Sequence, residues 1–163
     1  MYSVGDVLSI QYAGFKHYGL YIGNDMVIHN SKKSKFVVEI SLEEFSDGRT
    51  INVSSIKADN KSIAIQTAKK YLGLPYNLFA ENCEHFVRTC CGLVKESTQV
   101  QKYLISALGT GALLKSENAV VQAAGGAAAI AAMLTPSESS PVKNALILSC
   151  LIAGITYLAT QSE

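Results

Sequence analysis

One cysteine of the 163-residue chain has polar and titratable neighbours on both sides. Cys83 lies in the stretch Asn82–His85, which reads NCEH. A helix beginning at Asn82 or Cys83 would direct unpaired amide groups and the positive end of its dipole toward the thiol, which favours the nucleophilic thiolate. Cys90 and Cys91 follow two turns later, and we interpret them as small core residues. These residue types indicate a thiol active site with Cys83 as its nucleophile.

A cysteine nucleophile needs a base, and the chain has three histidines, His17, His29 and His85. On a helix, the side chains of His85 and Cys83 would point about 200° apart, so His85 is a poor base for this thiol. His17 and His29 fall on consecutive predicted strands. A connecting loop with an odd number of residues would place them on one face of the sheet, and a two-residue turn would place them on opposite faces. In the first case, one histidine could take the thiol proton, and the other could fix the tautomer of the first by a hydrogen bond to its far ring nitrogen.

Other interpretations of these residues stay open. Each histidine could be a hydrogen-bonded structural residue, and Cys83, His17 and His29 could together ligate zinc. No Cys-x-x-Cys or His-x₃-His spacing occurs, so we expect no metal and no cofactor. The four cysteines include an adjacent pair and one, Cys150, within an apolar run. This pattern favours a reducing compartment over a disulfide framework.

The N-terminal part of the chain is predicted to be α+β. Five short runs rich in Val, Ile and Tyr predict strands at Val7–Gln11, His17–Gly23, Met26–Asn30, Phe36–Ile40 and Thr50–Ser54. Ser41–Glu44 has a capping-box pattern that predicts a short helix. The apolar spacing of Ser62–Leu72 predicts a second helix, which Gly73 ends. A third helix is expected from Asn82 to about Lys95.

Charge nearly disappears from the C-terminal part of the chain. Residues 118–163 contain three charged side chains, and Asn118–Pro136 and Asn144–Thr160 contain none. The second run reaches the length needed to span a bilayer, about 17–25 residues. The small residues of the first would allow close helix pairing in a membrane, although a soluble Ala-rich helical pair is an alternative. We therefore predict a catalytic domain at 1–102, a linker at 103–117 and a hydrophobic tail at 118–163 that forms an anchor or hairpin.

The remaining composition narrows the function and the location. The 14 Lys and Arg nearly balance the 13 Asp and Glu, so no basic surface for nucleic acid is expected. A positive mean hydropathy of +0.20 excludes disorder for most of the chain. The N-terminus shows no secretory signal. Lys95, Lys102 and Lys115 flank the tail, which predicts an intracellular, membrane-associated protein with its catalytic domain on the cytoplasmic side.

Three motifs together resemble one known family. Gly5–Ile10, His17–Gly23 and Asn82–Val87, which reads NCEHFV, are similar to the lecithin:retinol acyltransferase-like family, in particular its phospholipase A/acyltransferase branch within the NlpC-type papain-like superfamily. The family's basic and aromatic positions before the first histidine are occupied here by Tyr12 and Phe15.

The resemblance implies a circularly permuted papain-like fold, an antiparallel sheet with a helix that carries the cysteine. It also implies Cys83 as nucleophile, His17 as general base and His29 as the third polar residue. Asn82, Glu84 and His85 belong to the motif and are expected to be structural.

We expect a membrane-associated, cysteine-dependent phospholipase A1/A2 or acyltransferase that acts on glycerophospholipid esters through an acyl-cysteine intermediate. Its expected partners are a phospholipid membrane, a lipid acyl donor and an acyl acceptor. One alternative is an NlpC-type cysteine peptidase or amidase. The other is a membrane-remodelling protein in which the tail is the active part.

Overall fold

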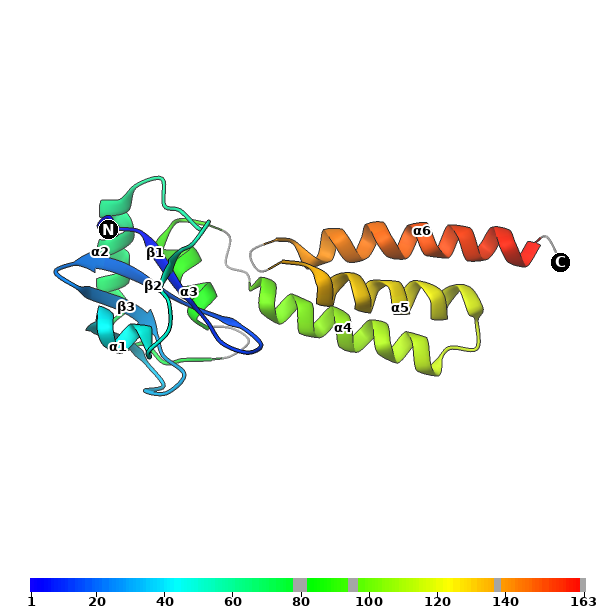
Figure 1. Ribbon diagram of the computed structural model, residues 1–163, viewed down its shortest axis with the longest axis horizontal. Coiled ribbons are helices and arrows are strands. Elements are labelled where there is room, and N and C mark those ends of the chain that lie inside the picture. The colour runs from blue at the N-terminus through cyan, green and yellow to red at the C-terminus, as the bar shows by residue number, and fades with distance from the viewer. Residues whose placement is uncertain (78–81, 94–96, 137–138, 162–163) are drawn as a thin grey trace. The chain divides into compact units, whose positions relative to one another are not determined.

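The structure is a computed structural model that describes residues 1–77, 82–93, 97–136 and 139–161. It divides into two compact units, Met1–Ser97 and Thr98–Glu163, whose elements are drawn in Figure 1.

The first unit contains a five-stranded sheet in the order β4-β3-β2-β1-β5, and every neighbouring pair of strands is antiparallel. The strands are β1 Val7–Gln11, β2 Lys16–Gly23, β3 Met26–Asn30, β4 Val37–Ser41 and β5 Asn52–Val53. Three helices accompany the sheet, namely α1 Leu42–Ser46, α2 Lys61–Lys70 and α3 Cys83–Cys90. The prediction of an α+β unit with an antiparallel sheet is confirmed.

The two faces of the sheet carry different helices, because successive side chains of a strand point to opposite faces. On one face, Tyr18 and Leu20 of β2 belong to a buried cluster with residues of α2 and α3, including Ala64 and Phe86. On the other face, Val27 and Leu8 pack with Phe45 of α1, whose short helix Figure 1 labels beside the sheet. The sheet is therefore covered by α2 and α3 on one side and by α1 on the other.

Helix α1 begins as its sequence predicts. The Ser41 hydroxyl accepts a hydrogen bond from the backbone N–H of Glu44 at 3.1 Å, the usual way for an N-cap serine to satisfy an unpaired amide group. Helix α3 is shorter than expected, because it ends at Cys90 and the following Gly92 has a φ of 73°. That left-handed conformation suits glycine and turns the chain out of the helix. Lys95, the predicted end of the helix, lies outside the described residues.

The second unit consists of α4 Thr98–Lys115, α5 Ala119–Leu134 and α6 Pro141–Gln161. The prediction of a linker at 103–117 differs from the structure, because most of that segment belongs to α4. Helix α4, which includes this segment as far as Lys115, packs against α5. Among the described residues, α6 is long and apolar enough to cross a membrane.

Candidate active site

The position of Cys83 is fixed by the residue before it. The Asn82 side-chain oxygen accepts hydrogen bonds from the backbone N–H groups of Glu84 and His85, each at 3.0 Å. Asn82 is therefore the N-cap of α3, and Cys83 is the first residue of the helix. The predicted start of this helix is confirmed, and the cap assigns Asn82 a structural role.

The environment of the Cys83 thiol favours its neutral form. The residue is only 7% exposed, and its Sγ lies 4.0 Å from the carbonyl oxygen of Lys16. Burial, with a smaller contribution from the nearby Glu84 carboxylate, raises the pKa of Cys83 to about 12, although backbone N–H groups oppose the shift. The helix start by itself favours a thiolate, but the loss of solvent outweighs that effect here.

The β2–β3 hairpin decides whether the two histidines share a face. Its turn has two residues, Asn24 and Asp25, both with positive φ, and Gly23 pairs with Met26. The register then shifts, so that Tyr21 pairs with Val27 and one extra residue, Ile22, forms a β-bulge. This extra residue reverses the alternation that a two-residue turn alone would impose. His17 and His29 consequently lie on the same face.

The two histidines contact each other directly. His17 Nε2 and His29 Nδ1 are 2.6 Å apart, within hydrogen-bond distance, and the two rings are nearly perpendicular at 81°. Burial lowers the pKa of His17 to about 4. Burial, with an added repulsion from His17, lowers the pKa of His29 to about 3. Both rings are therefore neutral at pH 7, so one nitrogen of the contact donates and the other accepts.

Phe45, an aromatic residue that no motif singles out, packs against both histidines. The ring of Phe45 is centred 5.6 Å from the His17 ring and 5.7 Å from the His29 ring, and Phe45 is 2% exposed. Gly19 leaves the space for it, since a Cβ at this position would lie 2.8 Å from a ring carbon of Phe45 and 3.3 Å from His29 Cβ. Phe45 belongs to α1, so the packing around His17 depends on a helix that lies far from His17 in the sequence.

The structure brings the two histidines together but does not join them to the cysteine. Helix α3 packs against the face of β2 that carries Tyr18, whereas His17 and His29 face Phe45. Within the described parts of the chain, no hydrogen bond links the Cys83 thiol to either histidine ring. The thiol lies instead beside the peptide bond between Lys16 and His17. The thiol is thus close in space to the backbone beside His17 but is not hydrogen-bonded to the His17 ring.

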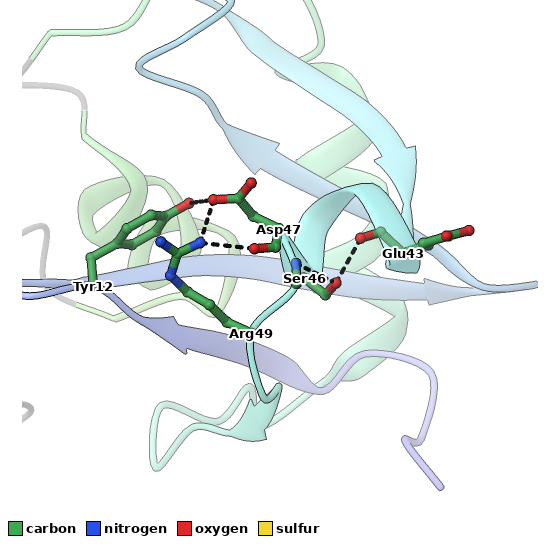
Figure 2. Close-up of polar contacts among 6 residues, drawn as sticks. Tyr12, Glu43, Ser46, Asp47 and Arg49 are labelled. Carbon is green, nitrogen blue, oxygen red and sulfur yellow. Dashed lines mark hydrogen bonds and ion pairs between the residues drawn. The ribbon is translucent and has the colours of Figure 1, made fainter.

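A polar network connects α1 to the β1–β2 hairpin that precedes His17 (Figure 2). The Tyr12 hydroxyl donates to the Asp47 carboxylate at 3.0 Å, and Arg49 forms an ion pair with the same carboxylate. The Arg49 guanidinium lies 4.1 Å from the centre of the Tyr12 ring, and Phe15 stacks on that ring at 4.8 Å. Arg49 therefore supplies a basic group beside Tyr12, one of the two residues that occupy the family's basic and aromatic positions.

The Glu84 side chain is buried and is held by polar partners. It is fully buried, accepts a hydrogen bond from the Ser97 hydroxyl at 2.9 Å and lies 3.7 Å from the Arg88 guanidinium. A carboxylate without solvent needs such partners. Glu84 thereby connects α3 to Ser97, the last residue of the first unit, and His85 beside it is also buried.

The described residues contain no group of three His, Cys, Asp or Glu side chains arranged to hold a metal ion. The four cysteines are free thiols, three of them buried, and Cys150 is exposed.

Comparison with known proteins places the chain in a family. The family model described as "Lecithin retinol acyltransferase" matches residues 1–95, more than half of the chain. The protein belongs to the lecithin retinol acyltransferase family, which confirms the resemblance of its motifs.

Two kinds of relative are similar to the chain. The "Lecithin retinol acyltransferase" of Rattus norvegicus is 29% identical over 135 residues, which cover 61% of this chain and 58% of the rat protein. The "Phospholipase A and acyltransferase 5" of Rattus norvegicus is 28% identical over 134 residues, which cover 69% of this chain and 47% of the rat protein. The chain spans about half the length of the curated relatives it matches. These relationships place the chain in a family of acyltransferases and phospholipases.

Proposed function

We propose that this protein is a membrane-associated thiol phospholipase A or acyltransferase that acts on glycerophospholipid esters. The observation that carries the proposal is the family match over residues 1–95, which includes a cysteine at a helix start and a pair of contacting histidines. We further propose that the N-terminal unit is a circularly permuted papain-like fold. The antiparallel sheet, in which the histidine strands precede the cysteine helix, is consistent with it.

The proposed reaction begins with transfer of the Cys83 thiol proton to the His17 ring. His17 Nδ1 accepts this proton, because the other ring nitrogen, Nε2, contacts His29. The thiolate sulfur then attacks the ester carbonyl carbon, and the backbone N–H of Cys83 at the helix start stabilises the oxyanion. Collapse breaks the bond between the carbonyl carbon and the alkoxide oxygen. His17 returns the proton to that oxygen, which leaves a lysophospholipid and an acyl-cysteine thioester.

The thioester is resolved by a second nucleophile. Water attack, with His17 again taking a proton, releases the fatty acid and restores the thiol. Attack by an amine or a hydroxyl transfers the acyl group instead. In both steps His29 accepts a hydrogen bond from His17 Nε2–H and stabilises the charged ring, as the third member of a triad does.

This mechanism requires a change from the geometry described above, because Cys83 and His17 must meet. The thiol is already 4.0 Å from the carbonyl oxygen of the residue before His17, and we propose that the change is a rearrangement at the start of this strand. Catalytic hydrogen bonds are often long in unliganded enzymes and shorten when substrate binds. We propose that binding at a lipid surface causes this rearrangement and thereby activates the neutral thiol.

Membrane association places the enzyme where its substrate is. We propose that α6 inserts into the bilayer and holds the first unit on the cytoplasmic side. The length and hydropathy of α6 support insertion, and Lys102 precedes the apolar segments as the positive-inside rule favours.

Substitution of the nucleophile tests the proposal. The full chain is incubated with phosphatidylcholine in mixed micelles, and the Cys83→Ser variant is compared with a Cys90→Ser control, whose buried thiol lies two turns along the same helix. We expect the first variant to lose activity by about 10²-fold or more and the control to retain it. Mass spectrometry should find a fatty-acyl adduct on Cys83. Equal activity of Cys83→Ser and the unmodified chain would overturn the proposal, and release from a muropeptide panel alone would favour a peptidase.

A further inference from the structure

The second unit distributes its side chains in the opposite way to a water-soluble helical domain. Its buried residues are small, among them Gly109, Gly125, Ala129 and Ala132. Its large apolar residues face outward instead, and they occur on all three helices. Among those exposed by more than half are Leu108, Leu114, Ile130, Met133, Leu151 and Ile155. A domain in water would bury the larger side chains, since their burial contributes most to its stability.

The contact between α4 and α5 is made by the backbones themselves. A Cβ added to Gly109 would lie 2.5 Å from the carbonyl oxygen of Gly125, and a Cβ added to Gly125 would lie 2.8 Å from the carbonyl oxygen of Gly109. Such close approach through small residues is typical of helix pairs in membranes, where association depends on packing and not on exclusion of water.

The charged side chains of this unit, and the groups that cap its helices, lie near the helix ends. At one end, the Lys102 ammonium donates to the Thr135 carbonyl oxygen at 2.5 Å, and the Asn144 amide donates to the Thr135 hydroxyl at 3.1 Å. These bonds join α4, α5 and α6. At the other end, Asn118 caps α5 and Lys115 ends α4. The helical surface between the two ends carries no charge.

Helix α6 is long enough to cross a bilayer, whereas α5 and the uncharged part of α4 are shorter than its hydrocarbon core. At about 1.5 Å per residue, α6 with 21 residues is about 31 Å long and α5 with 16 residues is about 24 Å long. The hydrocarbon core of a bilayer is about 30 Å thick. The uncharged part of α4, Tyr103–Leu114, is shorter, at about 18 Å. Because Lys102 and Lys115 flank it, their long side chains can extend to the headgroups on the two sides.

We propose that α4, α5 and α6 enter the bilayer together as one packed three-helix unit whose outer apolar surface contacts lipid chains. Three crossings place the α5–α6 connection on the same side as the first unit. They place the α4–α5 turn and the C-terminus on the opposite side. The inference extends the proposed membrane association but does not depend on the thiol chemistry, so its test is independent of activity.

Thiol labelling of the full chain in intact microsomes tests this topology. In a Cys150→Ser background, single cysteines replace three exposed residues: Ser34 in the first unit, Glu117 in the α4–α5 turn and Ser140 before α6. A membrane-impermeant maleimide is applied before and after saponin, which opens the membrane without dissolving it. The background chain measures labelling of the buried cysteines.

We expect Ser34→Cys and Ser140→Cys to be labelled before saponin, and Glu117→Cys only after it. Labelling of Glu117→Cys together with Ser34→Cys would show that α4 and α5 stay outside, and would overturn the proposal. Protection of Ser140→Cys before saponin would indicate a two-helix hairpin and would also overturn it. Glu117→Cys that reacts only in detergent would indicate a turn buried within the bilayer, which contradicts three crossings.

Discussion

At the scale of single residues, the three side chains proposed for catalysis are held in their uncharged forms. The pKa of Cys83 is about 12, and the pKa values of His17 and His29 are about 4 and 3. In each case the first cause is burial, which disfavours the charged form of a thiol and of an imidazole alike. A neutral thiol resists oxidation and unspecific acylation. The proposed enzyme would therefore be unreactive until it reaches its substrate.

Phe45 should control the protonation of the histidine pair, because its ring excludes water from both imidazoles. We expect Phe45→Ala to raise the pKa of His17 from about 4 toward the usual value near 6.5. Titration of the histidine C–H signals by NMR in the full chain measures this change. Exchange of Ile63, which is exposed on α2, for alanine is the control and should leave the signals unchanged. An unaltered pKa in Phe45→Ala would show that the ring does not exclude solvent.

The same burial should make the first unit sensitive to acid. Because the folded pKa values of both histidines lie below the unfolded value, the unfolded chain binds more protons at acidic pH. The contribution of the two histidines to the stability of the first unit is therefore complete above about pH 6.5. The free energy of unfolding decreases as the pH falls toward 4, by up to about 1.4 kcal/mol per pH unit for each histidine. Urea unfolding followed by the near-ultraviolet signal of the tyrosines measures it. The control is His17→Gln combined with His29→Gln, which should flatten this dependence. An unchanged slope would refute the linkage.

At the scale of secondary-structure elements, local patterns and long-range contacts differ in how well they can be predicted. Alternation of apolar residues was enough to find the strands, and Asn82 marked the start of α3, because both signals are local. Pairing of β2 with β3 depends on a bulge with no clear sequence signature. The contact of Phe45 with His17 and the place of Arg49 over Tyr12 join distant segments, so no local pattern could reveal them.

The helical structure of α4 within the predicted linker was also difficult to foresee, for a related reason. Its Gly109 and Gly111 weaken a helix prediction, since glycine costs about 1 kcal/mol in a helix interior. The structure shows what compensates at Gly109, namely the direct contact with Gly125. Nothing in the sequence of α4 alone indicates which glycine has this role.

The two glycines of α4 provide a matched comparison. A Cβ at Gly109 would collide with the backbone of α5, whereas a Cβ at Gly111 meets nothing within 4 Å. We expect Gly109→Leu to separate α4 from α5 and Gly111→Leu to be tolerated or mildly stabilising through helix propensity. Crosslinking between cysteines placed on α4 and α5 in membranes reports the separation. Equal crosslinking in both variants would show that the close approach does not hold the pair.

At the scale of the whole molecule, the low charge of the chain reflects two units with different surfaces. The first has the mixed polar surface of a soluble domain, and the second has an apolar one. Ser97 marks the boundary, because its hydroxyl still belongs to the first unit through Glu84.

Removal of the second unit should separate catalysis from membrane binding. We expect a chain ending at Ser97 to cleave a water-soluble short-chain ester like the full chain, but to lose about 10²-fold activity on phospholipid vesicles because its local concentration falls. A chain ending at Gly92 should be less stable by about 1–3 kcal/mol, since Glu84 loses its Ser97 donor. Activity assays and thermal unfolding check the two effects. Full vesicle activity of the Ser97-ended chain would contradict the assignment of membrane binding to the second unit.

The bulge at Ile22 limits how this hairpin can change in evolution or in design. His17 and His29 share a face only because one unpaired residue accompanies a two-residue turn. Loss or gain of a single residue between them would send one imidazole to the far side of the sheet, among the packed side chains of α3. Insertions and deletions in this interval should therefore be tolerated only in pairs. The separation of the two histidines in the sequence should therefore remain even, whereas the length of the hairpin itself is less constrained.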